Sequence, residues 1–224
     1  MKKLILPLFI LTRLLLTAQD TPTKITGMGK LKLGDSISLI NNLGYTIVSI
    51  KDYGEISKNK ANICRLIADT NATSYQPTLY AKTDPRCQVF TVPKINIGLD
   101  IEIKNVQLYF FNEILVKIVC DANTKLTEAM TLKYGKPILK SWSREGDSGI
   151  YEDVTYYETW KLGETEAREY LSVSYSKDHE KSISSSFQLS NEIVTAIIDK
   201  ESKLIEERAK QIELEKKKKS LEGF

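Results

Sequence analysis

Hydrophobic and polar residues alternate most regularly between residues 88 and 120. Ile95, Ile97, Leu99, Ile101 and Ile103 are separated by mostly polar neighbours, which is the two-residue period of a half-buried strand. The runs VQLYFF and ILVKIVC then flank Asn112-Glu113 and predict a hairpin. Three later runs, VTYYETWKL, YLSVSYS and SISSSFQL, predict further strands. The middle and the later part of the chain are therefore expected to be rich in strands.

Three other segments have the spacing of helices. In LKLGDSISLINNLGY, Asp35 or Ser36 is expected to cap a helix that Gly44 ends. In NTKLTEAMTLKYGKP, apolar residues recur on one helical face before a Gly-Lys-Pro stop. A third helix is expected to start after Asn191, with apolar first turns and later turns dominated by Glu, Lys and Arg.

This order predicts an α+β fold, with an antiparallel sheet or sheets, short packed helices and a long charged C-terminal helix. Strands and helices do not alternate as in a doubly wound parallel sheet. We divide the chain into an export signal at 1–18, a globular region at 19–198 and a charged helical tail at 199–224. The globular region is long enough for one domain or for two small modules, about 24–103 and 104–198.

The N-terminal stretch MKKLILPLFILTRLLLTAQD has the order of a bacterial export signal. Lys2 and Lys3 precede a short apolar run, and the small residues Thr17 and Ala18 offer a cleavage site. Arg13 interrupts the apolar region, so an uncleaved membrane anchor is the alternative. We expect a periplasmic or extracellular protein.

Removal of this signal changes the charge balance. The whole chain has 32 basic and 29 acidic residues. Lys2, Lys3 and Arg13 are lost with residues 1–18 and no acidic residue is lost, so 29 basic residues remain against 29 acidic ones. A chain without net charge has no electrostatic signature of nucleic-acid binding. Nucleic acid is therefore not an expected partner.

The three cysteines are Cys64, Cys87 and Cys120. Cys120 ends the run ILVKIVC, in which it shares the side opposite Lys117, and it is expected to lie in the core. In an oxidising compartment a Cys64–Cys87 disulfide is then the favoured pair. Three unpaired buried thiols are the alternative. The cysteine spacing matches no zinc site.

The tetrapeptide Gly146-Asp147-Ser148-Gly149 resembles the loop around a catalytic serine. The chain has one histidine, His179, and it follows Ser148, which is not the order of chymotrypsin-like or subtilisin-like proteases. Gly149 also breaks the spacing that an α/β-hydrolase needs. Because Gly, Ser and Asp are the usual residues of tight loops, we interpret the stretch as a turn. No catalytic residue, metal site or cofactor is predicted.

Aromatic residues gather on both sides of this loop: Trp142, Tyr151, Tyr156, Tyr157 and Trp160. Aromatic side chains beside carboxylates can form a sugar- or peptide-binding surface. Packing within strands and the core accounts for such residues more often, and it is the interpretation we favour.

Two stretches resemble the small BamE/SmpA-like modules of the bacterial envelope. LKLGDSISLINNLGY is similar to their Gly-then-helix-then-Leu-Gly opening, and LTEAMTLKYGKP is similar to a helix with a Gly-x-Pro stop. The lipid-attachment cysteine usual in those proteins is missing here. The resemblance implies an α+β envelope module and assigns no functional residue.

The C-terminal tail carries a narrow apolar stripe formed by Leu204, Ile205, Ala209 and Ile212. Such a seam suits a helix that pairs with a helix of a partner or of a second copy, whereas a solvated helix held by i,i+4 ion pairs is the alternative. The sequence as a whole indicates an exported, non-enzymatic protein that binds or scaffolds an unknown protein or envelope component. A small envelope hydrolase with unrecognised carboxylates and a membrane-tethered adaptor remain alternatives.

Overall fold

The computed structural model describes residues 22–51, 53–67, 86–145, 152–175 and 181–221. Its elements in chain order are β1 (Gly27–Met28), β2 (Leu31–Lys32), η1 (Ile37–Leu43), β3 (Ile47–Ile50), η2 (Tyr53–Lys58), β4 (Ile63–Leu66), β5 (Cys87–Gly98), β6 (Ile101–Phe111), β7 (Ile114–Asp121), α3 (Thr124–Tyr134), β8 (Ile138–Glu145), β9 (Glu152–Leu162), β10 (Thr165–Tyr175), β11 (Lys181–Asn191) and α4 (Glu192–Leu221).

Nine strands form one sheet in the order β3-β4-β5-β6-β7-β11-β10-β9-β8, and β1 pairs with β2 separately. Neighbouring strands are antiparallel except β3 and β4, which run parallel because η2 carries the chain back between them. The predicted α+β fold class is therefore wrong: the protein is mostly β, with one large mixed sheet. The segment predicted as the first helix forms only a seven-residue 3₁₀ helix, η1, with Ser36 as its cap.

Tight turns divide the strand-rich middle of the chain. Leu99 and Asp100 both have left-handed backbone angles, φ 53° and 54°, so the continuous strand predicted over residues 95–103 is in fact two strands, β5 and β6. Asn112 and Glu113 turn in the same way, at φ 48° and 64°, which confirms the predicted β6–β7 hairpin. The two-module alternative places its boundary after residue 103. This position lies inside β6, and the sheet continues across it.

One face of the sheet carries the main hydrophobic core. Residues from the N-terminal segment and from α3 cover it, and the largest side chains buried there include Ile25, Met28, Leu31, Ile40, Phe110, Ile118, Leu126, Met130 and Phe187. Asn123 caps α3 by accepting hydrogen bonds from the backbone N–H groups of Lys125 and Leu126. The indole Nε1 of Trp160 donates to the carbonyl oxygen of Gly135 at 2.9 Å. The predicted helix that ends at Gly135 is confirmed and is tied to β9.

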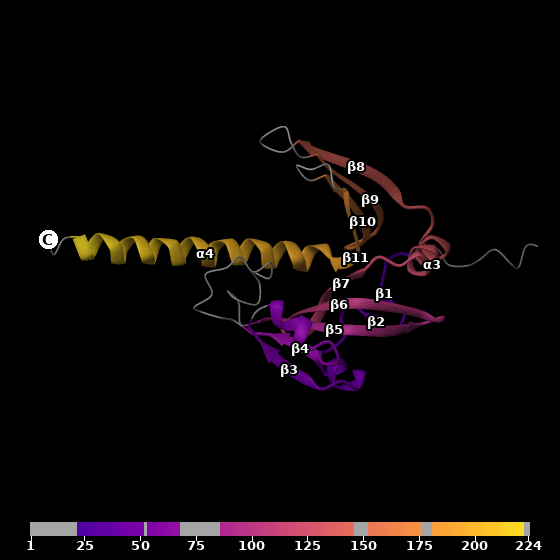
Figure 1. Cartoon of the computed structure of the whole chain (residues 1–224), viewed down its shortest axis with the longest axis horizontal. Coiled ribbons are helices and arrows are strands. Elements are labelled where there is room, and N and C mark those ends of the chain that lie inside the picture. Colours follow the sequence, from indigo (N-terminus) through magenta and orange to yellow (C-terminus); the bar gives the residue numbers. More distant parts are fainter. Residues whose placement is uncertain (1–21, 52, 68–85, 146–151, 176–180, 222–224) are drawn as a thin grey trace, which may run out of the picture.

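α4 begins against the opposite face of the sheet and then leaves the body (Figure 1). Val194 and Ile198 of its first turns pack with Cys87 and Val116 in a small separate cluster. Strands β8–β11 form the part of the sheet that bends upward in Figure 1, and β3–β7 form the lower part. None of the helices in the described ranges has the length and hydrophobicity needed to span a bilayer.

Candidate functional site

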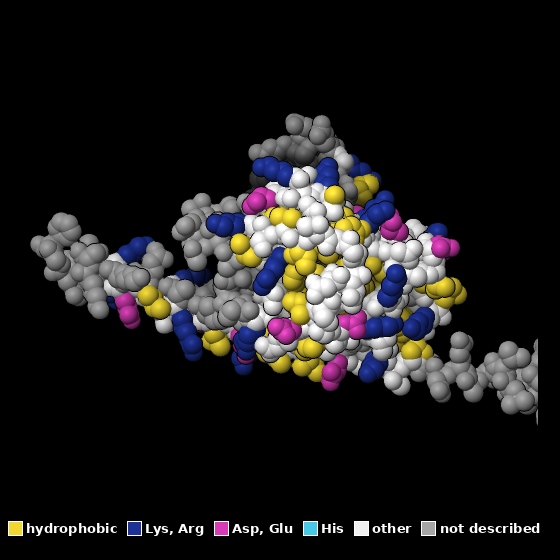
Figure 2. Space-filling view, turned by 90° about the horizontal axis from the view of Figure 1, so that it is seen from below, with side chains coloured by type: hydrophobic (Ala, Val, Ile, Leu, Met, Phe, Trp, Pro, Cys, Tyr) yellow, Lys and Arg dark blue, Asp and Glu magenta, His cyan; other side chains and the backbone are white. Residues whose placement is uncertain are grey.

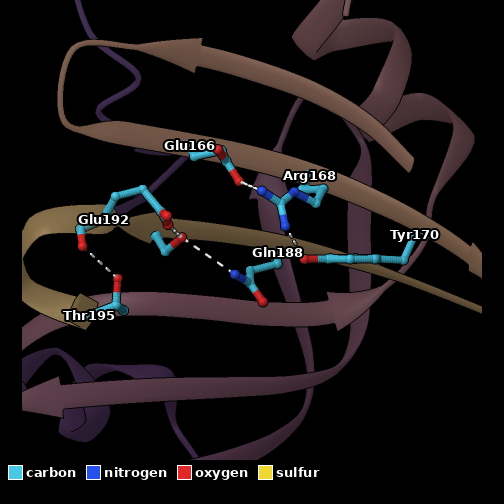
Figure 3. Close-up of polar contacts among 7 residues, drawn as sticks. Glu166, Arg168, Tyr170, Gln188, Glu192 and Thr195 are labelled. Atoms are coloured by element: carbon cyan, nitrogen blue, oxygen red, sulfur yellow. Dashed lines mark hydrogen bonds and ion pairs between the residues drawn. The ribbon is translucent and has the colours of Figure 1, made fainter. Parts of the chain in front are cut away.

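The base of α4 is fixed to β11 by a chain of polar contacts (Figure 3). The Oγ of Ser190 donates to Oε1 of Glu192 at 2.6 Å, and Nε2 of Gln188 donates to the Ser190 Oγ at 3.4 Å. Asn191 accepts a hydrogen bond from the backbone N–H of Val194 at 3.1 Å, which caps the helix. The Oγ1 of Thr195 donates to the carbonyl oxygen of Asn191 at 2.8 Å. The strand therefore determines the direction in which α4 starts.

The neighbouring strand β10 carries a row of three side chains on the face of the sheet that also holds Gln188 and Ser190 (Figure 3). The row consists of Glu166, Arg168 and Tyr170. The guanidinium of Arg168 pairs with the buried carboxylate of Glu166 and donates to the Tyr170 hydroxyl at 2.9 Å. Its central carbon lies 5.4 Å from the ring centre of Tyr157 on β9 and 5.5 Å from that of Tyr170. Burial lowers the pKa of Arg168, but the contact with Tyr170 and the charge of Glu166 raise it by more, so the guanidinium stays charged.

Sequence reasoning missed this row. Glu166, Arg168 and Tyr170 are two residues apart, which places them on one side of a strand. Opposite charges at that spacing are the only signal in the sequence, and exposed strands often show the same pattern. The partial burial that makes the row rigid depends on the neighbouring strands, which the sequence does not specify.

Lys117 lies where the sheet meets α4. Its ammonium group is 5.3 Å from the ring centre of Tyr109, in a small pocket that Thr195 and Ile198 of α4 also line. Burial lowers the pKa of Lys117, although the negative charges of Asp199 and Glu192 partly oppose the shift. The contact of α4 with the body is therefore partly polar and holds a lysine that is costly to bury.

Beyond this contact α4 exposes apolar side chains. Among the described residues, the hydrophobic clusters of the body include Val194 and Ile198 from α4 and no later residue. Glu201 forms an ion pair with Arg86. The exposed fraction is 50% for Ile193, 45% for Ile197, 46% for Leu204, 55% for Ile212 and 57% for Leu214. Of the predicted partner-binding residues, Leu204 and Ile212 are thus open to solvent; Ile205 and Ala209 lie in α4 but their side chains are outside the described set.

A cavity of about 500 Å³ lies between η1 and the second half of β5. Its wall includes Asp35, Asn42, Tyr45 and Lys94. Several of these groups hold the protein itself together: the Tyr45 hydroxyl donates to the Lys94 carbonyl oxygen at 3.1 Å, and a carboxylate oxygen of Asp35 accepts from the backbone N–H of Lys32 at 2.8 Å. These structural contacts therefore explain why some of the side chains in the cavity wall are polar.

The three cysteines are buried, and none of them forms a disulfide in the structure. Cys64 faces Thr91 across the β4–β5 pair, and Cys87 lies four residues further along β5, a distance of roughly 13 Å at the rise of a strand. Cα atoms more than about 7 Å apart cannot be bridged without movement of the backbone. The predicted Cys64–Cys87 disulfide is therefore absent from the structure, and the alternative of three buried thiols describes it. Burial raises the pKa of Cys120 to about 12, which makes its thiol unreactive.

Among the residues that the structure describes, the remaining sequence candidates do not come together in a site. Ser148, His179 and Tyr151 lie outside the described residues. Trp160 is buried in the core, while Tyr156 and Tyr157 point to opposite faces of β9, so these aromatic residues do not form one surface. No group of three or more His, Cys, Asp or Glu side chains that could hold a metal ion occurs in the described part of the chain.

Lysine and arginine side chains are dispersed among acidic and apolar ones on the face drawn in Figure 2, without a basic patch. Comparison with known proteins found no matching family model, no matching curated protein and no matching solved structure.

Proposed function

We propose that the protein is an exported, non-enzymatic scaffold whose sheet presents α4 for pairing with another helix. The observation that carries this proposal is the half-exposed apolar series on α4 (Ile193, Ile197, Leu204, Ile212 and Leu214). A helix that belongs only to its own domain normally buries such residues against the core. Here the apolar positions continue past the last turn that contributes to a hydrophobic cluster of the body.

The polar network at the base of α4 supports the same function. A helix that is to meet a partner benefits from a fixed direction, because less conformational freedom is then lost on binding. The hydrogen bonds of Ser190, Asn191 and Thr195 supply that direction. The proposal of export rests on the leader-like first 18 residues, and an envelope component is accordingly the expected environment of the partner.

Site-specific photo-crosslinking in cells tests this function. A photoreactive benzoylphenylalanine replaces Leu204 in one full-length protein and Ile212 in another, and Lys210 in a matched control. At about 100° per residue, Lys210 lies more than about 100° around the helix from both Leu204 and Ile212. We expect covalent adducts from positions 204 and 212 and few or none from position 210. Equal or absent labelling at all three positions would show that the apolar side of α4 does not contact a partner.

A further inference from the structure

We propose that the side of strands β8–β11 that faces away from the main core is a binding surface for an extended, neutral glycan of the β-1,4-linked pyranose class. The inference goes beyond the proposed function, because it concerns the outer strands of the sheet and not α4. Its basis is a surface on which three aromatic rings lie among hydroxyl groups and which carries little charge.

The strand register defines this surface. Directly opposed residues of antiparallel strands point to the same side of a sheet. The buried residues Trp160, Ala167 and Leu189 are opposed in this way and mark the core side. Two rows on the other side each cross four strands, roughly 14 Å. We call them the outer face: Trp142, Thr155, Ser172 and Ser184 in one row, and Lys140, Tyr157, Tyr170 and Ser186 in the next.

The outer face carries three aromatic rings. Trp142 lies on β8, the edge strand of the sheet, and 54% of it is exposed, although tryptophan is highly buried on average. Tyr157 and Tyr170 are directly opposed in the next row, and their ring centres lie 6.2 Å apart. Two of the aromatic residues noted in the sequence, Trp142 and Tyr157, thus share a face with Tyr170. Such rings offer apolar platforms on which the C–H faces of pyranose rings stack.

Arg168 holds the two tyrosines in place. Its guanidinium lies 5.4 Å from the ring centre of Tyr157 and 5.5 Å from that of Tyr170. It also donates to the Tyr170 hydroxyl, as Figure 3 shows, and pairs with Glu166. Rings that are already fixed lose little conformational freedom when a ligand binds. We therefore assign Arg168 as a positioning residue of the outer face, which gives the polar row on β10 a function.

Hydroxyl groups and low charge decide the chemistry of the ligand. Oγ1 of Thr155 and Oγ of Ser172 lie 3.0 Å apart and share a hydrogen bond. Hydroxyl groups both donate and accept, as sugar hydroxyls do. Among the eight residues of the outer face only Lys140 is charged, whereas a nucleic acid needs several cations along its phosphates. An apolar peptide would find more apolar side chains on the other side of the sheet, where Leu171 and Ile183 are exposed.

The arrangement favours an extended chain of sugars. The exposed ring of Trp142 lies at one end of its row, and the other three positions of that row all carry hydroxyl groups. A β-1,4-linked pyranose chain is an elongated ribbon that presents C–H faces and equatorial hydroxyls, so it can place one ring on Trp142 and direct hydroxyls to the neighbouring strands. An α-1,4-linked chain curves and does not match an elongated row as well.

Titration of the full-length protein with cellohexaose and with chitohexaose tests the proposal. We expect a dissociation constant below about 1 mM for at least one of them, measured by calorimetry. Because Trp160 is buried and Trp142 is half exposed, quenching of tryptophan fluorescence by acrylamide reports mainly on Trp142 and should decrease on binding. Maltohexaose has the same number of sugar units in α-1,4 linkage. It is the matched control ligand and should bind at least about tenfold more weakly.

Variants locate the binding to the outer face. W142A should weaken binding at least about tenfold, because it removes the largest exposed ring of the surface. S184A removes one hydroxyl group and should weaken binding about threefold. Y156A is the matched control: Tyr156 is an exposed aromatic residue of β9 that points to the opposite side of the sheet, so the dissociation constant should stay within about twofold. Thermal unfolding checks that each variant is folded.

Three results would overturn the proposal: no binding of either β-1,4-linked hexaose up to about 5 mM, equal affinity for maltohexaose, or equal losses in W142A and Y156A. Oligothymidylate is the probe for the competing class of ligand, because bases also stack on exposed aromatic rings. If it binds more tightly than both β-1,4-linked hexaoses and W142A abolishes that binding, the outer face is a platform for single-stranded nucleic acid and the glycan proposal is wrong.

Discussion

Lys117 projects from the middle of β7 into the contact between the sheet and α4, where its charge is only partly compensated. Burial lowers its pKa in the folded protein below the ordinary value of 10.5. Above that lowered pKa the folded state binds fewer protons than the unfolded state, so stability rises with pH in the interval up to 10.5. Below the interval the cost of the buried charge is fully present.

We therefore predict that K117M stabilises the protein at pH 7 by about 1 kcal/mol, because methionine fills a similar volume without a charge. The advantage should shrink as the pH is raised towards 10.5. Urea unfolding at pH 7 and at higher pH measures both effects. K140M, at an exposed position of β8, is the matched control and should show neither. A loss of stability in K117M at pH 7 would mean that Asp199, Glu192 and the Tyr109 ring outweigh the cost of burial.

The cysteines give a second prediction at this scale. Because Cys64, Cys87 and Cys120 are all buried thiols that form no disulfide, they should resist an alkylating reagent at pH 8 in the folded protein. After unfolding in denaturant without a reductant, all three should be modified. Mass spectrometry of the digested protein measures this directly. A peptide pair joined through Cys64 and Cys87 would show that the β4–β5 register differs from the one described.

Among the elements, the short β1–β2 hairpin depends on a close approach of backbone. Gly29 has φ +57°, and a Cβ atom there would lie 1.7 Å from the carbonyl oxygen of Ile97 on β5. G29A should therefore destabilise the protein by about 3 kcal/mol, measured by urea unfolding. G163A is the control: Gly163 has a similar left-handed angle, φ +61°, but a Cβ atom there would meet only the carbonyl oxygen of Thr23, at an ordinary contact distance of 3.6 Å, so we expect only about 1 kcal/mol. Equal losses of stability would mean that the backbone angle of residue 29, and not the contact with β5, is what makes a Cβ atom unfavourable there.

Local signals in the sequence predicted several elements because those elements follow from short-range chemistry. The helix α3, with Asn123 and Gly135 at its ends, and the turn at Asn112-Glu113 are examples. The strand β8 was not predicted, since ILKSWSRE does not alternate cleanly, although the Gly-Lys-Pro stop comes directly before it. The turn at Leu99-Asp100 was missed because Leu99 continued the alternation, and only its backbone angle shows that it leaves the strand.

At the scale of the whole molecule, the parallel β3–β4 pair and the joining of β7 to β11 could not be read from the sequence. Both connect segments whose pairing depends on which edges remain free after local hairpins have formed. The predicted partner-binding residues lie on a helix that the sheet holds at one end. The network of Glu166, Arg168 and Tyr170, in contrast, depends on which strands pair with one another, and the sequence does not indicate that pairing. Local pattern thus indicated the candidate interaction element, and only the assembled sheet gives its orientation.

The described body and the outer part of α4 are expected to be energetically independent. Residues of the three hydrophobic clusters extend from Ile25 to Ile198, so a chain that ends at Ser202 keeps all of them. Residues 203–224 contain oppositely charged residues at i,i+4 spacing, such as Glu206 and Lys210, and pairs of this kind contribute only about 0.2–0.5 kcal/mol each. We predict that the midpoint of thermal unfolding at low protein concentration changes by less than about 3 °C.

The same truncated protein should lose helical circular dichroism and the binding of a partner helix that the proposed function assigns to α4. L204Q in the full-length chain is the matched control, because it removes one apolar side chain from the contact and leaves the length and charge of the helix unchanged. It should weaken association and leave the unfolding midpoint of the body in place. If truncation lowers the midpoint by much more than about 3 °C at concentrations where the protein is monomeric, the outer turns of α4 pack on their own body and do not serve another helix.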